Sequence, residues 1–362
     1  MSSVSGCIRY FYRNGMTQYS IWLVVHLLVL GLGWCPAVSV SAAVNPMCGV
    51  MSNTLSRQAK ADLLPVFYAA LHRPKGQIPK NTAEWDALAK FFEQSQTAHQ
   101  EAMARSFGVT FKEDMLGGVP VLRIYPKNYK SSTRLLVYVH GGGYVVQSAH
   151  STVGISSLLA RESGLQVVAI DYTLAPHGTY QTATDQVISV WNALIKLGRQ
   201  PESMGMFGDS AGGGLAAGSI LKMRDQRIPI PGALFVGSPW ADLSDVGDSY
   251  LTLKYFDPVL KVGILNAAAD IYAHDAKKNP YASPVYGDFN KPFPPTLIQG
   301  GTRELFLSDS VRLYQAIRQG GHEAILDLYE GMPHIFYTYT YTSKEGKTAL
   351  SRQAKFFDNH LK

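Results

Sequence analysis

The spacing of apolar residues changes along the chain and separates a helical part from a mixed part. Between about residues 53 and 107 apolar residues recur at helical spacing, and no strand pattern interrupts them. We therefore expect helices whose apolar stripes face a core. The apolar positions are Leu63, Leu64, Phe67, Leu71, Trp85, Leu88, Phe91 and Phe92.

Beyond residue 108, short apolar runs of strand length alternate with helical stretches. Two runs flank Gly117-Gly118, which predicts an antiparallel hairpin with arms at about 109–112 and 119–125. Because strands that alternate with helices form a mostly parallel sheet covered on both faces, the pattern predicts an α/β fold. The further strands are predicted near residues 135, 167, 204, 233, 296 and 325.

Length and composition agree with a single enzyme unit. The chain has 362 residues, of which 46% are hydrophobic, and this is enough for a large core. The formal net charge of +6 comes without a basic cluster interleaved with aromatic residues, so we expect no nucleic-acid partner. Only Cys48 of the three cysteines lies beyond residue 43, so a chain processed there could form no internal disulfide.

Residues 1–43 have the pattern of an export signal. Arg9 and Arg13 precede an apolar run over residues 21–34, and small residues follow. We predict a signal peptide cleaved at about residue 43, a secreted or periplasmic protein, and no stable membrane insertion of the mature chain. The alternative is an uncleaved membrane anchor.

The most informative motif is Gly208-Asp209-Ser210-Ala211-Gly212, a serine with glycine at both second-neighbour positions. It lies between an apolar run at 204–207 and a helical stretch of small and apolar residues at 215–221. A serine on a sharp strand-to-helix turn can be exposed as a nucleophile. Because the motif is short, an ordinary glycine-rich turn is the alternative.

A second motif, His140-Gly141-Gly142-Gly143-Tyr144, follows the apolar run at 135–139. Three glycines without side chains can turn backbone N–H groups toward one point, as esterases and lipases do to hold an oxyanion. We expect the N–H groups of Gly142, Gly143 and Ala211 to form such an oxyanion hole. We expect His140 to position the loop.

Together the two motifs resemble the hormone-sensitive-lipase-like family of α/β-hydrolases. The resemblance runs from about Leu116 to the C-terminus and includes residues 171–176, 238–243 and 331–334. It implies an α/β-hydrolase fold, with residues 108–362 as the catalytic domain. It also implies a helical cap over the active site, built from residues 44–107 and an insertion at about 244–282.

The remaining members of a catalytic triad should follow the serine in the order acid, then histidine. His334 lies in the loop after the predicted strand near 325, where the resembled family carries its catalytic histidine. The family usually has an aspartate just past the strand near 296, where this chain has Glu304. Since glutamate can orient a histidine as aspartate does, we assign the acid to Glu304, with Asp309 as the alternative.

Several further residues are candidates for the surroundings of the triad. Tyr144, Asp209 and Trp240 are predicted to line the substrate pocket, although Tyr144 could simply pack. Asp171 and Asp242 are expected to hold loops near the triad. The aromatic residues of the insertion are candidates either for a substrate pocket or for packing: Tyr250, Tyr255, Phe256 and Tyr272.

These residues favour a serine carboxylesterase that forms an acyl-enzyme and needs no metal or organic cofactor. We expect a small-molecule ester substrate with a short to medium acyl chain, and lactones or acetylated sugars fall within that class. An amidase or peptidase with the same triad is one alternative. A ligand receptor on a hydrolase scaffold is another, because function resides in the site and not in the fold.

Overall fold

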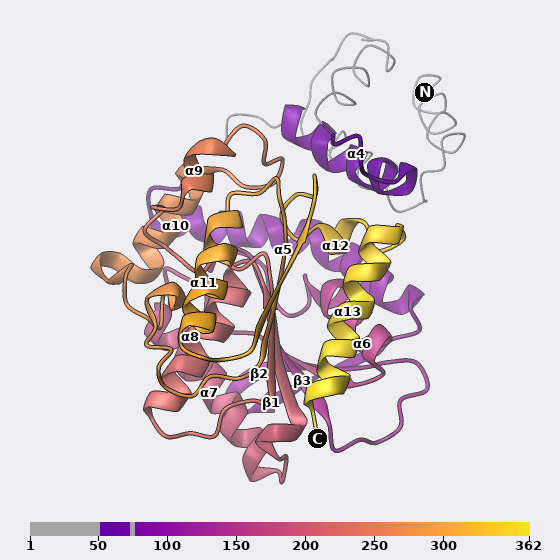
Figure 1. Ribbon diagram of the computed structural model, residues 1–362, viewed down its shortest axis with the longest axis vertical. Coiled ribbons are helices and arrows are strands. Elements are labelled where there is room, and N and C mark those ends of the chain that lie inside the picture. Colours follow the sequence, from indigo (N-terminus) through magenta and orange to yellow (C-terminus); the bar gives the residue numbers. More distant parts are fainter. Residues whose placement is uncertain (1–50, 73–76) are drawn as a thin grey trace.

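The computed structural model describes residues 51–72 and 77–362, so the predicted signal peptide at 1–43 lies outside the described residues. An eight-stranded sheet runs through the protein in the order β1-β2-β4-β3-β5-β6-β7-β8, with helices on both faces (Figure 1). β2 pairs antiparallel with β1 and β4, and the other neighbours are parallel. The strands are β1 (Thr110–Leu116), β2 (Val119–Tyr125), β3 (Leu135–Val139), β4 (Gln166–Ile170), β5 (Met204–Asp209), β6 (Ala233–Gly237), β7 (Thr296–Gly301) and β8 (Ala324–Tyr329).

The predicted α/β fold is confirmed, and each strand expected beyond residue 108 is present. The first arm of the hairpin is longer than predicted, because β1 continues to Leu116 instead of ending near residue 112. Lys112, Glu113 and Asp114 interrupt its apolar pattern. A strand at the edge of a sheet tolerates such charges, since one of its sides faces solvent.

The two faces of the sheet carry separate hydrophobic cores, as β3 illustrates. Leu135, Val137 and Val139 belong to one core, whereas Leu136 and Tyr138 belong to the other. Successive side chains of a strand point to opposite faces, so a strand covered on both sides is apolar throughout. Helices α7 (Tyr180–Lys196), α8 (Ala211–Asp225) and α11 (Leu307–Gln319) cover the first face, and α6 (Val153–Ser163) and α13 (Lys344–His360) cover the second.

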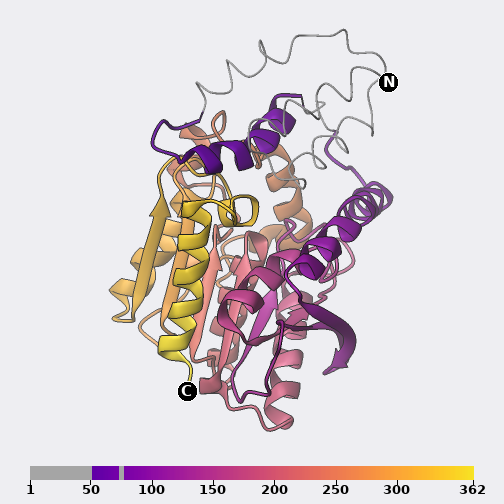
Figure 2. The ribbon, with the colours of Figure 1, turned by 90° about the vertical axis from the view of Figure 1, so that its right-hand side faces the viewer.

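The remaining helices lie mainly at the carboxyl ends of the parallel strands (Figures 1 and 2). Two of them precede the sheet in the chain, and two belong to the segment at 244–282. No helix in the described part of the chain is long and apolar enough to cross a membrane. These helices are α4 (Arg57–His72), α5 (Thr82–Ser106), α9 (Asp248–Thr252) and α10 (Val262–Ala273), and the short α12 (Phe336–Tyr339) follows β8.

The helices expected between residues 53 and 107 are present, but their apolar stripes are only partly buried. Leu63, Phe67 and Trp85 lie in the core, whereas Leu71 is 59% exposed and Phe91 is 53% exposed. In the 25-residue α5, burial is confined to Trp85 near one end and to Met103 and Ala104 near the other. Between these ends Leu88, Ala89 and Phe92 are only partly buried against the core, so helical spacing alone overstated the burial of this helix.

Candidate active site

Ser210 lies in the turn between β5 and α8. Its φ of 57° and ψ of −127° are a conformation that a residue with a side chain adopts only when the surrounding structure imposes it. A Cβ on Gly208 would lie 2.4 Å from the backbone oxygen of Gly212, and a Cβ on Gly212 would lie 2.1 Å from that of Val139. Only glycine fits at both positions, so the motif determines the sharp turn that presents the serine at the end of β5.

The structure brings Ser210, His334 and Glu304 into one hydrogen-bonded chain. Nε2 of His334 lies 2.9 Å from Oγ of Ser210, and its Nδ1 lies 2.7 Å from Oε2 of Glu304. Ser210 is 7% exposed, His334 2% and Glu304 0%. With Nδ1 donating to the carboxylate, Nε2 is left to accept the proton of the serine hydroxyl.

The carboxylate of Glu304 is held from its other side as well. Its Oε1 accepts hydrogen bonds from the amide of Gly301 at 2.7 Å and from Oγ of Ser238 at 3.0 Å. A buried carboxylate is costly unless its oxygens are paired, so these donors both offset the burial and set the orientation. The side chain of Glu304, which is one methylene longer than that of an aspartate, reaches His334 at hydrogen-bond distance.

Asp309, the alternative acid, lies away from the histidine. Its Oδ2 accepts from the amides of Ala241 and Asp242 at 3.0 and 2.9 Å. Burial, together with repulsion from Asp242, raises the pKa of Asp309 well above its usual range. Because this carboxylate joins the first turn of α11 to the loop after β6, its contacts are those of a residue that holds two elements together.

The glycine loop after β3 passes directly beside Ser210. Gly142 and Gly143 have φ values of 104° and 62°, which favour glycine strongly. A Cβ on Gly141 would come within 3.1 Å of the Cβ of Ser210. Among the hydrogen bonds of residues 51–72 and 77–362, none uses the amide of Gly142, Gly143 or Ala211 as a donor. Three N–H groups next to Ser210 are thus open to a ligand.

Asp209 holds this loop through a hydrogen bond from the amide of Gly141. It is only 3% exposed, and its Oδ1 accepts from the Tyr138 hydroxyl at 2.5 Å. Burial raises the pKa of Asp209 to about 6, while hydrogen bonds from Tyr138 and from the amide of Gly141 favour the ionised form. Asp209 thus connects β5 to the loop through Gly141, and its predicted contact with substrate stays a prediction.

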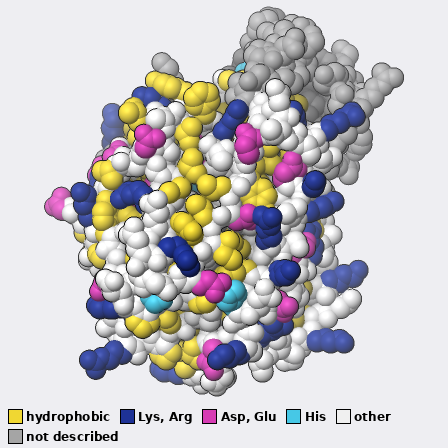
Figure 3. Space-filling model, viewed as in Figure 1, with side chains coloured by type: hydrophobic (Ala, Val, Ile, Leu, Met, Phe, Trp, Pro, Cys, Tyr) yellow, Lys and Arg dark blue, Asp and Glu magenta, His cyan; other side chains and the backbone are white. Residues whose placement is uncertain are grey.

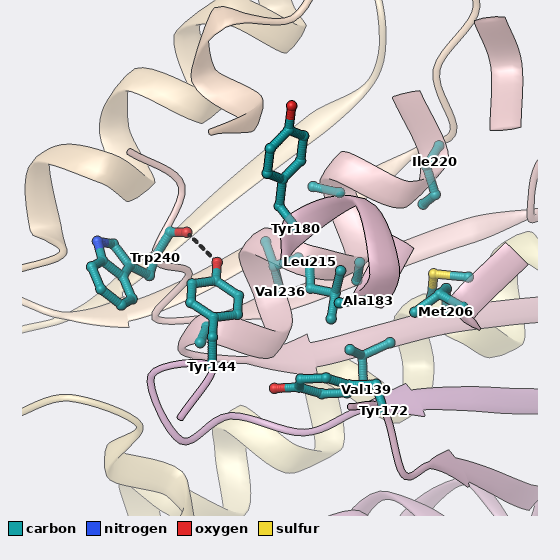
Figure 4. Packing of buried hydrophobic residues seen from close by; sticks show 14 of the residues in the cluster. Val139, Tyr144, Tyr172, Tyr180, Ala183, Met206, Leu215, Ile220, Val236 and Trp240 are labelled. Atoms are coloured by element: carbon teal, nitrogen blue, oxygen red, sulfur yellow. Dashed lines mark hydrogen bonds between the residues drawn. The ribbon is translucent and has the colours of Figure 1, made fainter. Parts of the chain in front are cut away.

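Tyr144 and Trp240 are packed inside a stack of aromatic rings. Tyr144 is 0% exposed and Trp240 is 1% exposed. The ring of Tyr144 lies parallel to that of Tyr272, with a centroid distance of 3.7 Å, and 5.4 Å from that of Trp240. Figure 4 shows the Tyr144 hydroxyl turned toward the backbone oxygen of Trp240, at 3.4 Å. These contacts are those of packing, and a part in lining the substrate pocket stays a prediction for both residues.

Ser238 belongs to this site although its sequence context did not predict it. Its Oγ donates to Glu304 and accepts from the amide of Ile335 at 2.9 Å, so this side chain bridges the acid and the residue after His334. The φ of 46° shows a strained backbone immediately after β6. The available signal was its position directly after a predicted strand, in the segment that carries the family resemblance.

An apolar hollow opens between α4 and the segment before α10. Figure 3 shows hydrophobic side chains in a band that runs from the upper part of this face through its middle. Asp257 at the hollow is buried, and its Oδ2 accepts from the amide of Leu305, the residue after Glu304, at 2.8 Å, so the lining of the hollow adjoins the loop that carries Glu304. Its lining consists of Phe67, Ala70, Leu71, Tyr255, Phe256, Asp257, Pro258 and Lys261.

The four aromatic residues predicted for the insertion separate into two pairs. Tyr250 and Tyr272 are buried at 5% and 1% exposure, whereas Tyr255 and Phe256 are 84% and 51% exposed.

Within the described residues, no group of three His, Cys, Asp or Glu side chains could hold a metal ion.

Known proteins are similar to this chain in both sequence and fold. The alpha/beta hydrolase fold family matches residues 136–338 of this chain. An acetyl-hydrolase of Streptomyces hygroscopicus is 33% identical over 62% of this chain and 75% of its own length. An esterase of Acinetobacter venetianus is 32% identical over 64% of this chain and 76% of its own.

Two solved structures extend the likeness beyond the region matched in sequence. An esterase from the bacterial hormone-sensitive lipase family superimposes with a TM-score of 0.75 at 26% identity, over 85% of this chain and 99% of that one. An esterase/lipase from an uncultured bacterium superimposes with a TM-score of 0.73 at 26% identity, over 83% and 98%. The chain therefore belongs to the α/β-hydrolase family and is a carboxylic ester hydrolase of the hormone-sensitive-lipase-like type.

Proposed function

We propose that the protein is a serine carboxylesterase with Ser210 as nucleophile, His334 as general base and acid, and Glu304 as the residue that orients the histidine. The observation that carries this proposal is the hydrogen-bonded chain of 2.9 and 2.7 Å that joins the three side chains at a strained turn. A hydroxyl with an ordinary pKa is a weak nucleophile, and the histidine provides the base that it needs.

The reaction follows from these positions. Oγ of Ser210 attacks the ester carbonyl while Nε2 of His334 takes its proton, and the tetrahedral intermediate expels the alkoxide, which receives that proton. Water then attacks the acyl-enzyme with the same base and releases the acid. The amides of Gly142, Gly143 and Ala211 would receive the oxyanion, and each well-aimed donor contributes about 3 kcal/mol.

The substrate class that we propose is small esters with short to medium acyl chains, with lactones and acetylated sugars inside that class. A related protein is named an acetyl-hydrolase, which supports short acyl groups. The apolar hollow in the cap supports a substrate with a modest apolar part. Hydrolysis should peak at short chains and fall steeply for long-chain triglycerides, because a roofed site limits the chain it can hold.

A p-nitrophenyl ester series tests both parts of the proposal. Purified protein should hydrolyse p-nitrophenyl acetate, and the rate should decline from short to long acyl chains. Rates that increase steadily up to emulsified long-chain lipids would contradict the substrate class and indicate a lipase. Binding of esters without turnover would support the receptor alternative.

For location, we propose a secreted or periplasmic protein whose residues 1–43 are removed. The support is the charged, apolar and small-residue order of that segment. Mass spectrometry of the chain purified from its own host should show an N-terminus near residue 44. An intact N-terminus in the membrane fraction would instead support the anchor.

A further inference from the structure

Asp257, in the cap segment between α9 and α10, binds the loop that carries the acid of the triad. Its Oδ2 accepts from the amide of Leu305, the residue after Glu304, at 2.8 Å. Its Oδ1 accepts from the amides of Val259 and Leu260 at 2.7 and 2.8 Å. The side chain is 1% exposed, so this carboxylate is a buried junction between the cap and the acid loop.

Ser249, in α9 of the same insertion, binds Leu305 as well and adds a contact with Ser308 at the start of α11. Its Oγ donates to the backbone oxygen of Leu305 at 2.5 Å and accepts from the amide of Ser308 at 3.0 Å. In return, the amide of Ser249 donates to Oγ of Ser308 at 3.0 Å. The peptide units on the C-terminal side of Glu304 are therefore held at both their N–H and C=O groups by the cap.

Tyr272, in α10, makes the corresponding contact with the oxyanion loop. Its ring lies flat on that of Tyr144, 3.7 Å between centroids and 4° between planes. Tyr144 directly follows Gly143 and has a strained φ of 67°. Within the described part of the chain the Tyr272 hydroxyl has no hydrogen-bond partner, so the contact is made by the ring.

We infer that the cap insertion positions the two reactive loops of the esterase, with Asp257 and Ser249 holding the acid loop and Tyr272 holding the oxyanion loop. This inference rests on the proposed function. It assigns to the insertion a task beyond covering the substrate, because the three residues contact catalytic loops and are nearly inaccessible to solvent. All three are positioning residues, since each acts through the backbone or ring of a neighbour.

A positioning function predicts a particular kinetic signature. A shift of about 1 Å in a catalytic group can cost about 100-fold in rate without changing how the substrate is held. Loss of a positioning contact should therefore lower kcat and leave KM and the order of preference among acyl chains unchanged. Loss of a wall of the substrate pocket would instead change KM and the acyl-chain preference.

Asp257→Ala is the first test, and Asp270→Ala is its matched control. Asp270 is an acid of the same insertion, but it is exposed on α10, and its ion pair within the described residues is with Lys277. With p-nitrophenyl acetate, Asp257→Ala should lower kcat by about 100-fold. Because Asp257 also lines the hollow, the test for an unchanged KM uses Ser249→Ala and Tyr272→Ala. The rate at which an organophosphonate labels Ser210 should decrease in proportion. Asp270→Ala should resemble the wild type in kcat and in labelling rate.

Two smaller changes keep the test decisive if Asp257→Ala does not fold. Ser249→Ala removes the Oγ contacts with Leu305 and with the amide of Ser308 and keeps the backbone bond to Oγ of Ser308, and Thr252→Ala in the same helix changes an exposed hydroxyl as a control. Tyr272→Ala removes the ring from Tyr144, whereas Tyr272→Phe retains it. We expect lower kcat in Ser249→Ala and in Tyr272→Ala, and recovery of kcat in Tyr272→Phe. Urea unfolding of each variant confirms that the folded state is the one assayed.

The outcomes separate the two levels of the proposal. A wild type that hydrolyses no ester and is not labelled at Ser210 would overturn the proposed function. An active wild type with unchanged kcat in folded Ser249→Ala and Tyr272→Ala would overturn the positioning inference alone. Variants with altered KM and acyl-chain preference but normal kcat would also overturn it, and would make the insertion a pocket wall.

Discussion

The nucleophile side of the site and the acid side are built in different ways. The turn at Ser210 depends mainly on its own neighbours, since Gly208 and Gly212 make room for it, and one bond to a distant residue joins the amide of Ser210 to the backbone oxygen of Gly237 at 2.8 Å. Glu304 is held by partners distant in the chain, with Ser238 66 residues away and His334 30 residues away. A local steric arrangement can be read from a short motif, whereas a network of distant partners requires the folded chain.

The two sides also carry different energetic costs. On the nucleophile side the cost is strain in backbone angles, which only the surrounding structure can impose. On the acid side the cost is a buried carboxylate, which is tolerable because three donors reach it. Substitutions should therefore affect the two sides differently, and four changes test this.

The largest effect should come from removing the nucleophile. Ser210→Ala should leave a folded protein whose esterase rate is lower by about four to six decades, because neither the attacking oxygen nor an acyl-enzyme is available. An organophosphonate should label Ser210 in the wild type and nothing in the variant, as peptide mass mapping can show. Full activity in the alanine variant would contradict the whole assignment.

The next change distinguishes the two candidate acids. Glu304→Gln should lower kcat by about four decades, because the amide no longer stabilises the imidazolium or selects its tautomer. Asp309→Asn should keep most of the activity and change mainly the midpoint of urea unfolding, since Asp309 binds the amides of Ala241 and Asp242. The reverse ranking of the two rates would place the acid at Asp309.

Asp209 offers a test through stability and pH. Its pKa is about 6 in the folded protein, and a free aspartate has a value of about 3.9. The folded state therefore binds the proton more tightly, and the free energy of unfolding should decrease as pH increases from about 4 to 6, by about 3 kcal/mol in total. Asp209→Asn should remove this part of the pH dependence, measured as the difference between urea unfolding curves of the two proteins. If the free energy of unfolding changed with pH equally in both proteins, the raised pKa of Asp209 would be contradicted.

The smallest effect is expected at Ser238, which only supports the acid. Ser238→Ala removes one hydrogen bond to the Glu304 carboxylate and one acceptor for Ile335, so kcat should decrease about tenfold. KM for p-nitrophenyl acetate should stay close to that of the wild type. Ser244, a serine in the following loop that bonds to Asp242, provides the control as Ser244→Ala. A Ser238→Ala variant with wild-type kcat would show that the remaining donors suffice.

The strands and the positions of the three candidate triad residues could be predicted from the sequence, because each depends on local pattern. Periodicity identified the strands, although it ended β1 early, where Lys112, Glu113 and Asp114 occupy an edge strand. It also placed Leu71 and Phe91 in the core, whereas more than half of each side chain is exposed. Periodicity indicates which side of a helix is apolar, but not whether another element covers it.

By itself the sequence determined the features that depend on neighbouring residues, namely the strand and helix pattern, the turn at Ser210 and the glycine loop at Gly142 and Gly143. Steric limits on the backbone act over a few residues, so a short motif is enough to predict them. Only the tertiary structure showed that Glu304, and not Asp309, lies at hydrogen-bond distance from His334, and only it showed the contacts of Ser238 and Asp257. Ser210 and His334 are 124 residues apart in the chain, and their 2.9 Å contact depends on how β5 and the loop after β8 are placed by the whole sheet. Such contacts are set by packing between distant segments, for which no local pattern carries the information.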